Sequence, residues 1–212
     1  MTGSRNDPLT QPEPPAPASG RKAPVPKRKQ PGRYRVPPRE QRHGLVIVNT
    51  GDGKGKTTAA LGLLLRAAGR EMSVAMYQFV KRMDDGGEHR TAERLGVDIL
   101  PLGAGCTLGR DDLSDDAALA RVGWTHCRGL VERGEYDVLI LDELTLPLAW
   151  GWIDVAEVIA ALRARPAGTH VVITGRHAPP ALVDAADLVT EMRLVRHAYV
   201  DRGLRAQAGI EV

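Results

Sequence analysis

An apolar run, a glycine-rich loop and a helical stretch follow one another without interruption between residues 45 and 68. Residues 45–49 read LVIVN, residues 50–58 read TGDGKGKTT, and residues 59–68 carry leucine and alanine at helical spacing. A Walker A loop, which binds the phosphates of a nucleotide, requires this order of strand, loop and helix. The segment therefore predicts an α/β domain that binds a nucleotide at a loop following a parallel strand.

The loop residues have distinct expected tasks. The glycines permit backbone angles that turn N–H groups toward an anion at a helix N-terminus. Lys56 would place its ammonium group against phosphate oxygens, and the Thr57 hydroxyl would bind a bridging Mg²⁺. Thr50 departs from the usual motif, which has glycine at this first position. We expect nucleotide contacts from Gly51, Asp52, Gly53, Lys54, Gly55, Lys56, Thr57 and Thr58.

A second strand-like run ends in two carboxylates. Residues 138–141 read VLIL, and Asp142 and Glu143 follow. Ligands lie at the carboxyl ends of the strands in open parallel sheets, so either acid could hold Mg²⁺, directly or through water. The alternative is that these acids only solvate the end of a strand.

The same alternation of strand and helix continues through residues 44–212, which we expect to form one domain. The pattern predicts strands at residues 45–49, 74–80, 97–101, 138–142, 170–174 and 188–191. Helical stripes end at Gly69 and Gly134, and a third lies at residues 155–162, with Asp154 as its N-cap and Glu157 as a capping-box partner. The predicted fold class is α/β, a parallel sheet with flanking helices and right-handed crossovers.

Residues 1–43 have a different composition. They hold ten of the fifteen prolines and ten Lys/Arg against three acids, whereas the rest of the chain is net acidic. Such a segment cannot bury enough apolar surface to offset the entropy of ordering, and it is predicted to be a disordered tail. The alternative is a basic arm that touches an anionic partner. The sequence pI of about 9.0 thus belongs to the tail and does not indicate a nucleic-acid surface on the domain.

Several classes of protein are excluded. Cys106 and Cys127 are too few for a disulfide scaffold and fit no zinc spacing. No apolar run is long enough to span a membrane, and the N-terminus lacks the apolar core of a secretion signal, so we expect a cytoplasmic protein with no membrane partner. No Asn-Lys-x-Asp motif is present, which argues against a GTPase.

Beyond the loop, further segments resemble one known family. The segments are residues 50–58, QFVK at 78–81, LDELT at 141–145, ITGR at 173–176, ADLVTEMR at 186–193, and residues 197–210. In this order the chain resembles the ATP:corrinoid adenosyltransferases of the cobalamin pathway. Their phosphate loop also begins with a residue other than glycine.

The resemblance implies a RecA-like P-loop NTPase fold and a specific reaction. In that family the cobalt of reduced cob(I)alamin, or of cobyrinic acid a,c-diamide, attacks the ribose 5′-carbon of ATP and triphosphate leaves. The match implies catalytic roles for Lys56, Thr57 and Glu143, Mg²⁺ ligation by Thr57 and Glu143 with Asp142 beside them, and phosphate contact by Arg176. It further implies ATP as co-substrate, a homodimer, and a possible reductase or corrinoid-delivery partner. Arg176 could instead belong to a structural ion pair.

The chain departs from the family where aromatic side chains normally face the corrin. The usual aromatic-Thr-aromatic run corresponds to residues 105–108, which read GCTL, so Cys106 and Leu108 replace the rings. A tryptophan common after the QFVK segment is also missing from residues 82–86. Trp150 or Trp152 could face the corrin instead. Two other functions therefore stay open: a P-loop ATPase or kinase, and a nucleotide- or corrinoid-binding module without adenosyl transfer.

Overall fold

A computed structural model describes residues 35–81, 86–105 and 113–211. Six strands form one sheet in the order β3-β2-β4-β5-β1-β6, and every neighbouring pair is parallel. Their bounds are β1 Val46–Thr50, β2 Val74–Gln78, β3 Asp98–Pro101, β4 Val138–Asp142, β5 His170–Thr174 and β6 Leu188–Glu191. The predicted α/β fold with a parallel sheet is confirmed.

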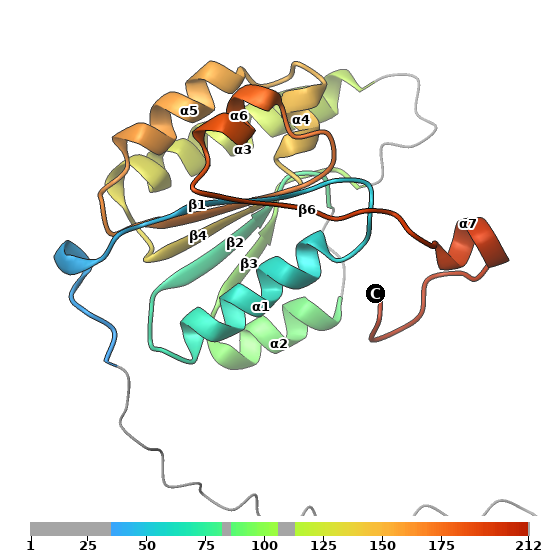
Figure 1. Cartoon of the computed structure of the whole chain (residues 1–212), viewed down its shortest axis with the longest axis horizontal. Coiled ribbons are helices and arrows are strands. Elements are labelled where there is room, and N and C mark those ends of the chain that lie inside the picture. The colour runs from blue at the N-terminus through green and yellow to red at the C-terminus, as the bar shows by residue number, and fades with distance from the viewer. Residues whose placement is uncertain (1–34, 82–85, 106–112, 212) are drawn as a thin grey trace, which may run out of the picture. The chain divides into compact units, whose positions relative to one another are not determined.

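Helices cover both faces of the sheet (Figure 1). One face carries α1 (Lys56–Ala68) and α2 (Gly87–Leu95), and the opposite face carries α3 (Ser114–Arg133), α4 (Thr145–Ala149), α5 (Val155–Ala164) and α6 (Pro180–Ala185). Each face has its own cluster of buried apolar side chains. Because both faces are covered, β2 and β4 are buried at every position, as their unbroken apolar sequences predict.

The predicted strands all form, although β2 ends at Gln78 rather than at residue 80. The helices α1, α3 and α5 match the three predicted stripes. Asp154 caps α5 by accepting a hydrogen bond from the Ala156 N–H at 2.8 Å. Glu157 forms an ion pair with Arg128 of α3 at 2.9 Å, which takes the place of the expected capping-box contact.

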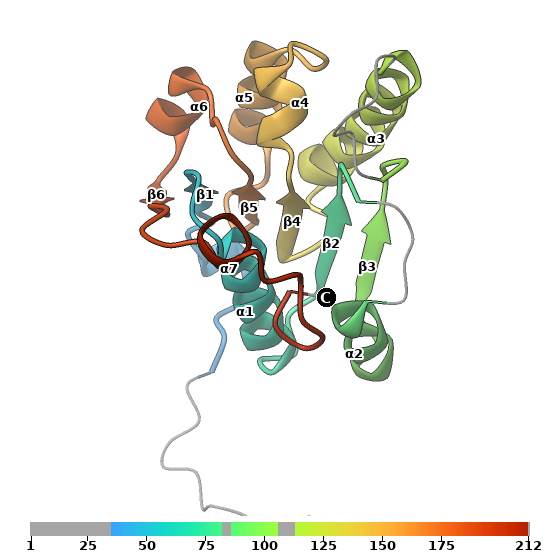
Figure 2. The same ribbon diagram turned by 90° about the vertical axis from the view of Figure 1, so that its right-hand side faces the viewer.

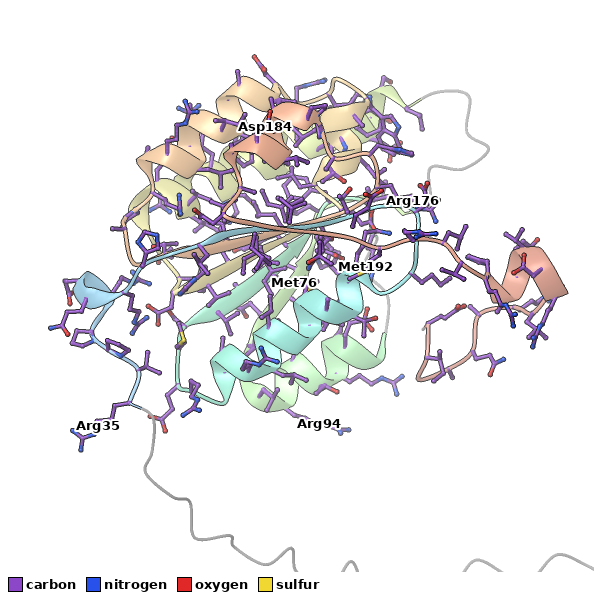
Figure 3. The ribbon with its side chains drawn as sticks, in the orientation of Figure 1. Arg35, Met76, Arg94, Arg176, Asp184 and Met192 are labelled. Carbon is purple, nitrogen blue, oxygen red and sulfur yellow. The ribbon has the colours of Figure 1, made fainter. Side chains whose placement is uncertain are left out.

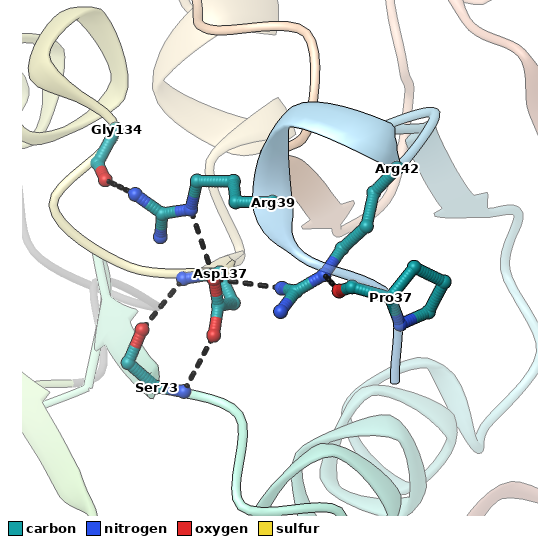
Figure 4. Close-up of polar contacts among 6 residues, drawn as sticks. All are labelled: Pro37, Arg39, Arg42, Ser73, Gly134 and Asp137. Carbon is teal, nitrogen blue, oxygen red and sulfur yellow. Dashed lines mark hydrogen bonds and ion pairs between the residues drawn. The ribbon is translucent and has the colours of Figure 1, made fainter. Parts of the chain in front are cut away.

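The compact unit begins at Val36, before the domain start expected at Gly44. Residues 36–43 include a short 3-10 helix, η1 (Arg39–Gln41), that lies against the start of β4 (Figure 4). Asp137 accepts from Arg39 at 2.9 Å, pairs with Arg42 at 2.8 Å and accepts from the Ser73 N–H at 3.0 Å. The expected tail therefore contributes these residues to the domain, and residues 1–34 lie outside the described part.

The chain after β6 leaves the sheet, forms α7 (Ala198–Arg202) and then turns back toward α1 and α2 (Figures 1 and 2). Among the described helices, none combines the length and apolar character needed to cross a membrane.

Candidate nucleotide-binding site

The loop between β1 and α1 forms one wall of a cavity of about 330 Å³. Residues 53–58 line it from the loop and from the first turn of α1, and Glu143 and Arg176 line it from the loops after β4 and β5. These loops meet because parallel strands place their carboxyl ends at one edge of the sheet. The cavity thus combines a helix N-terminus with both acidic and cationic side chains.

Lys56 is 6% exposed and lies at the start of α1. Its ammonium group donates to the carbonyl oxygens of Gly51 at 2.8 Å and Gly53 at 2.6 Å. Burial lowers the pKa of Lys56, whereas Glu143 is the largest influence that raises it. The partners of the ammonium group are neutral carbonyls, so an arriving phosphate would offer it a stronger, charge-assisted hydrogen bond.

Thr57 and Asp142 are joined directly. The Thr57 hydroxyl donates to Oδ1 of Asp142 at 2.9 Å, and the Thr174 hydroxyl donates to the same oxygen at 2.6 Å. The Gln78 amide nitrogen donates to Oδ2 at 3.3 Å, and the amide oxygen accepts from Nε2 of His89 at 3.0 Å. Asp142 is fully buried and holds the Thr57 hydroxyl in place, behind the cavity rather than in its wall.

Glu143, by contrast, lines the cavity. Its φ of 60° is in the left-handed region, which a residue with a side chain rarely adopts, and its N–H donates to the Thr174 hydroxyl at 3.0 Å. Burial and then the charge of Asp142 raise the pKa of Glu143, while Lys56 is the largest influence that lowers it. This strained residue follows β4 directly, and it lines the cavity where the buried Asp142 does not.

Two loop glycines are required for different reasons. Gly55 caps α1 with a φ of 106°, a left-handed conformation that favours glycine. Gly53 lies against the backbone of Met192 and Arg193, where a Cβ atom would collide with both carbonyls. Its N–H donates to the Met192 carbonyl at 2.6 Å. In this structure the Gly53 N–H therefore ties the loop to the segment after β6, while the residue itself lines the cavity.

Thr50, the departure from the usual motif, also ties the loop to its surroundings. Its hydroxyl accepts from the Ala178 N–H at 3.2 Å, and its carbonyl accepts from the Met192 N–H at 2.8 Å. Figure 3 shows Met192 and Arg176 on the chain segments that flank the loop. A glycine at position 50 could not make the hydroxyl contact, so threonine links β1 to the segment that carries Arg176.

The structure brings most of the predicted residues to one cavity: Lys54, Lys56, Thr57, Thr58, Glu143 and Arg176 all line it together with Gly53 and Gly55. Gly51 and Asp52 lie outside its lining. Lys81, Glu88, Ile210 and Glu211 line it without having been predicted as site residues. The QFVK segment contains Lys81 and was a usable signal, whereas nothing in the pattern indicated that the C-terminus returns to the loop.

The expected corrin-facing positions are only partly described. Trp150 and Trp152 contact one another, with ring centroids 4.6 Å apart, and neither lines the cavity. Cys106 and Leu108 lie outside the described residues, as do residues 82–85.

The donors around Thr57 suit a magnesium ion bound together with phosphate. No cluster of three or more His, Cys, Asp or Glu that could hold a metal by itself occurs among the described residues. Magnesium, however, takes few protein ligands, prefers oxygen and completes its shell with phosphate and water. The Thr57 hydroxyl and the Glu143 carboxylate fit that requirement.

Comparisons with known proteins show what the chain is similar to. A solved structure, the flagellar accessory protein FlaH from Methanocaldococcus jannaschii, aligns with a TM-score of 0.48 and 15% identity over 71% of each chain. Corrinoid adenosyltransferase CobA of Salmonella typhimurium is 39% identical over 177 residues, which cover 84% of this chain and 90% of that protein. A corrinoid adenosyltransferase from a Sinorhizobium species is 40% identical over 172 residues, which cover 79% of this chain and 80% of that protein. The profile of the family described as ATP:corrinoid adenosyltransferase BtuR/CobO/CobP matches residues 42–212, and the chain therefore belongs to this family.

Proposed function

We propose that this protein transfers the 5′-deoxyadenosyl group of ATP to the cobalt of a reduced corrinoid. The electron pair of cobalt forms the new cobalt–carbon bond, the bond between C5′ and its oxygen breaks, and triphosphate leaves with the electron pair of that carbon–oxygen bond. The observation that carries the proposal is the family match over residues 42–212, which contain every residue of the cavity.

The chain's own residues would act on the leaving group. Charge builds on the triphosphate as the carbon–oxygen bond breaks, and fixed donors in a site shielded from water stabilise such charge strongly. Lys56 and Arg176 line the cavity and could reach phosphate oxygens. The reduced cobalt is itself the nucleophile, so the protein's remaining task is to position two substrates.

Thr57 and Glu143 are the residues that would hold Mg²⁺, which supplies additional positive charge to the phosphates. Asp142 contributes indirectly. It accepts a hydrogen bond from the Thr57 hydroxyl, which leaves the lone pairs of that oxygen available to a cation.

The test is anaerobic incubation with MgATP and chemically reduced cob(I)alamin. Adenosylcobalamin, followed by its spectrum, and triphosphate, followed by chromatography, should appear in equal amounts. ADP and phosphate without corrinoid dependence would instead indicate an ATPase or kinase. Bound ATP with no product would indicate a binding module and would contradict the proposal.

A homodimer is part of the proposal, and exposed apolar side chains support it. The edge strand β6 is exposed at all four positions, including Leu188 and Val189, and Val195 beyond it is 79% exposed. An exposed edge strand with apolar side chains is a template for pairing with another chain. Sedimentation of the full chain should give the mass of a dimer, and Val189→Lys should shift it toward the monomer.

The proposed setting is the cytoplasm, where a reductase or corrinoid-delivery protein could supply the reduced substrate. Cys127 is a buried free thiol, which is compatible with a reducing compartment. Fractionation of cells that produce the tagged protein would test the compartment.

A further inference from the structure

The C-terminal residues return to the phosphate loop from a distance in sequence. After α7, Gly203 ends the helix in the left-handed conformation, and the chain turns back toward α1 and α2 (Figure 2). The N–H groups of Ile210 and Glu211 both donate to the Gln207 carbonyl, at 3.1 Å and 3.0 Å. This turn presents the side chains of residues 210 and 211 together.

Glu211 reaches the loop itself. Its carboxylate lies 3.0 Å from the ammonium group of Lys54, and the two side chains are 23% and 52% exposed. An ion pair this exposed contributes little to folding stability. Its consequence is positional, because a lysine side chain has several rotatable bonds and Glu211 restrains this one beside the loop.

Ile210 lies where two cavities meet. It lines the phosphate cavity and also an apolar groove of about 300 Å³ between α1 and α2, and both share Leu61 and Glu88. Ile210 is nevertheless 80% exposed, so the fold gains little from burying it. Its position beside the loop matters more to the site than to the core.

Glu211 is one of three carboxylates that line the cavity, together with Glu88 and Glu143. Glu88 is paired with Lys81 at 3.1 Å, and Glu143 faces Lys56. A further carboxylate at an anion-binding cavity would repel phosphate unless a cation kept it engaged. Lys54 is that cation in this structure.

We propose that residues 207–211 form part of the nucleotide site, closing the phosphate end of the cavity. Glu211 is a positioning residue that holds the Lys54 ammonium group over the loop, and Ile210 shields that end from water beside Leu61. The inference deepens the proposed function and rests on it for the identity of the nucleotide. Because Lys54 would contact phosphate, we expect Glu211 to affect the binding of inorganic triphosphate as well as that of ATP.

The test compares Glu211→Gln with the matched control Glu93→Gln, an exposed residue of α2 outside both cavities. Calorimetric titration should show that Glu211→Gln weakens the binding of both MgATP and magnesium triphosphate by about fivefold, the scale of a partly exposed ion pair. Glu93→Gln should bind both as the unchanged protein does. Ile210→Ala should weaken both in the same direction.

A double variant tests whether Glu211 acts through Lys54. In a Lys54→Met background, Glu211→Gln should have no further effect on either affinity, since the two changes remove one interaction. Equal losses in both backgrounds, a loss with MgATP but not with triphosphate, tighter binding, or no change would each overturn the inference. If the unchanged protein transfers the adenosyl group while these variants bind normally, the inference fails and the proposed function stands.

Discussion

At the residue scale, the side chain of Gln78 connects two parts of the site. It is fully buried, its amide nitrogen donates to Asp142, and its amide oxygen faces His89 of α2. The carboxylate accepts only, so the amide must direct its NH₂ group toward Asp142 and its oxygen toward His89. Gln78 thus fixes the orientation of the carboxylate that holds Thr57.

Gln78→Leu should destabilise the protein by about 1–3 kcal/mol, because an apolar side chain of similar size cannot replace the hydrogen bonds to Asp142 and His89. Urea denaturation monitored by circular dichroism would measure the loss. The exposed variant Arg66→Met serves as the control and should unfold at the concentration found for the unchanged protein. Equal midpoints for all three would contradict the role of Gln78.

Lys56→Met should lower kcat/KM for MgATP by about 10²- to 10³-fold, the usual cost of removing one donor to a developing negative charge. The loop would also lose the contacts of Lys56 to the Gly51 and Gly53 carbonyls. The adenosylation assay measures the rate, and Arg66→Met on the exposed side of α1 is again the control. A loss below tenfold would argue against phosphate contact by Lys56.

From the sequence, the positions of the candidate site residues were easier to predict than the role of each residue. The pair Asp142 and Glu143 was predicted at a strand end, but their division of labour depends on a positive φ at Glu143 that no local pattern indicates. Gly53 is predicted as part of the anion nest, and the structure adds a second requirement for glycine, the close approach of Met192, which is remote in sequence. A local motif predicts which residue types lie at the site, whereas tertiary contacts determine which of their atoms remain available to a ligand.

At the scale of elements, η1 and the residues around it attach the segment before β1 to the start of β4. Arg39 and Arg42 come from the basic segment, and Asp137 immediately precedes the strand (Figure 4). Arg39 also donates to the Gly134 carbonyl at the end of α3. These contacts lie at the amino ends of the strands, away from the phosphate loop.

A chain that begins at residue 36 should unfold at the same denaturant concentration as the full chain. A chain that begins at residue 44 should be less stable by about 1–2 kcal/mol, because it loses both guanidinium partners of a partly buried carboxylate. Denaturation of the three chains side by side measures the difference. Equal stability of the two shortened chains would show that η1 contributes nothing.

Asp137→Asn should reduce stability at neutral pH and not in acid. Burial opposes the ionisation of Asp137, but the Ser73 N–H and the guanidinium groups of Arg39 and Arg42 outweigh it and lower its pKa. A lowered pKa contributes stability above the unfolded-state value, and that contribution disappears as the pH falls through the folded-state value. The stability gap between variant and unchanged protein should therefore narrow below about pH 4. A gap that stays constant with pH would contradict this account.

The strands and the longer helices were predictable, and the shorter helices were not. The three stripes of α1, α3 and α5 repeat over several turns, and the buried strands have continuous apolar sequences. By contrast, α4 contains Pro147, and α7 begins after His197, whose ring accepts from two backbone N–H groups in place of a usual capping residue. Such five-residue helices depend on tertiary contacts, because a single turn of helix is unstable alone.

At the scale of the whole molecule, the N-terminal segment and the rest of the chain have net charges of opposite sign. Residues 1–35 contain eight Lys/Arg and two acids, so the unit from Val36 onward is net negative although the sequence pI is about 9.0. A surface that binds DNA or RNA needs clustered positive charge, and two of the lysines at the described cavity, Lys54 and Lys81, are paired with acids. The positive charge that gives the protein its basic pI is therefore carried by residues other than those of the site.

Removing residues 1–35 should abolish binding to a cation exchanger at pH 7.5 and should make the protein bind an anion exchanger instead. Any affinity of the full chain for double-stranded DNA at low salt should disappear with the same truncation, since non-specific binding follows the number of Lys/Arg that neutralise phosphates. MgATP affinity and adenosyl transfer should be unchanged, because the cavity lies entirely within the remaining unit. Retained DNA binding by the shortened chain would place a nucleic-acid surface on the domain and contradict this separation. A lost adenosyl transfer with normal MgATP binding would show instead that the basic segment acts at the corrinoid step.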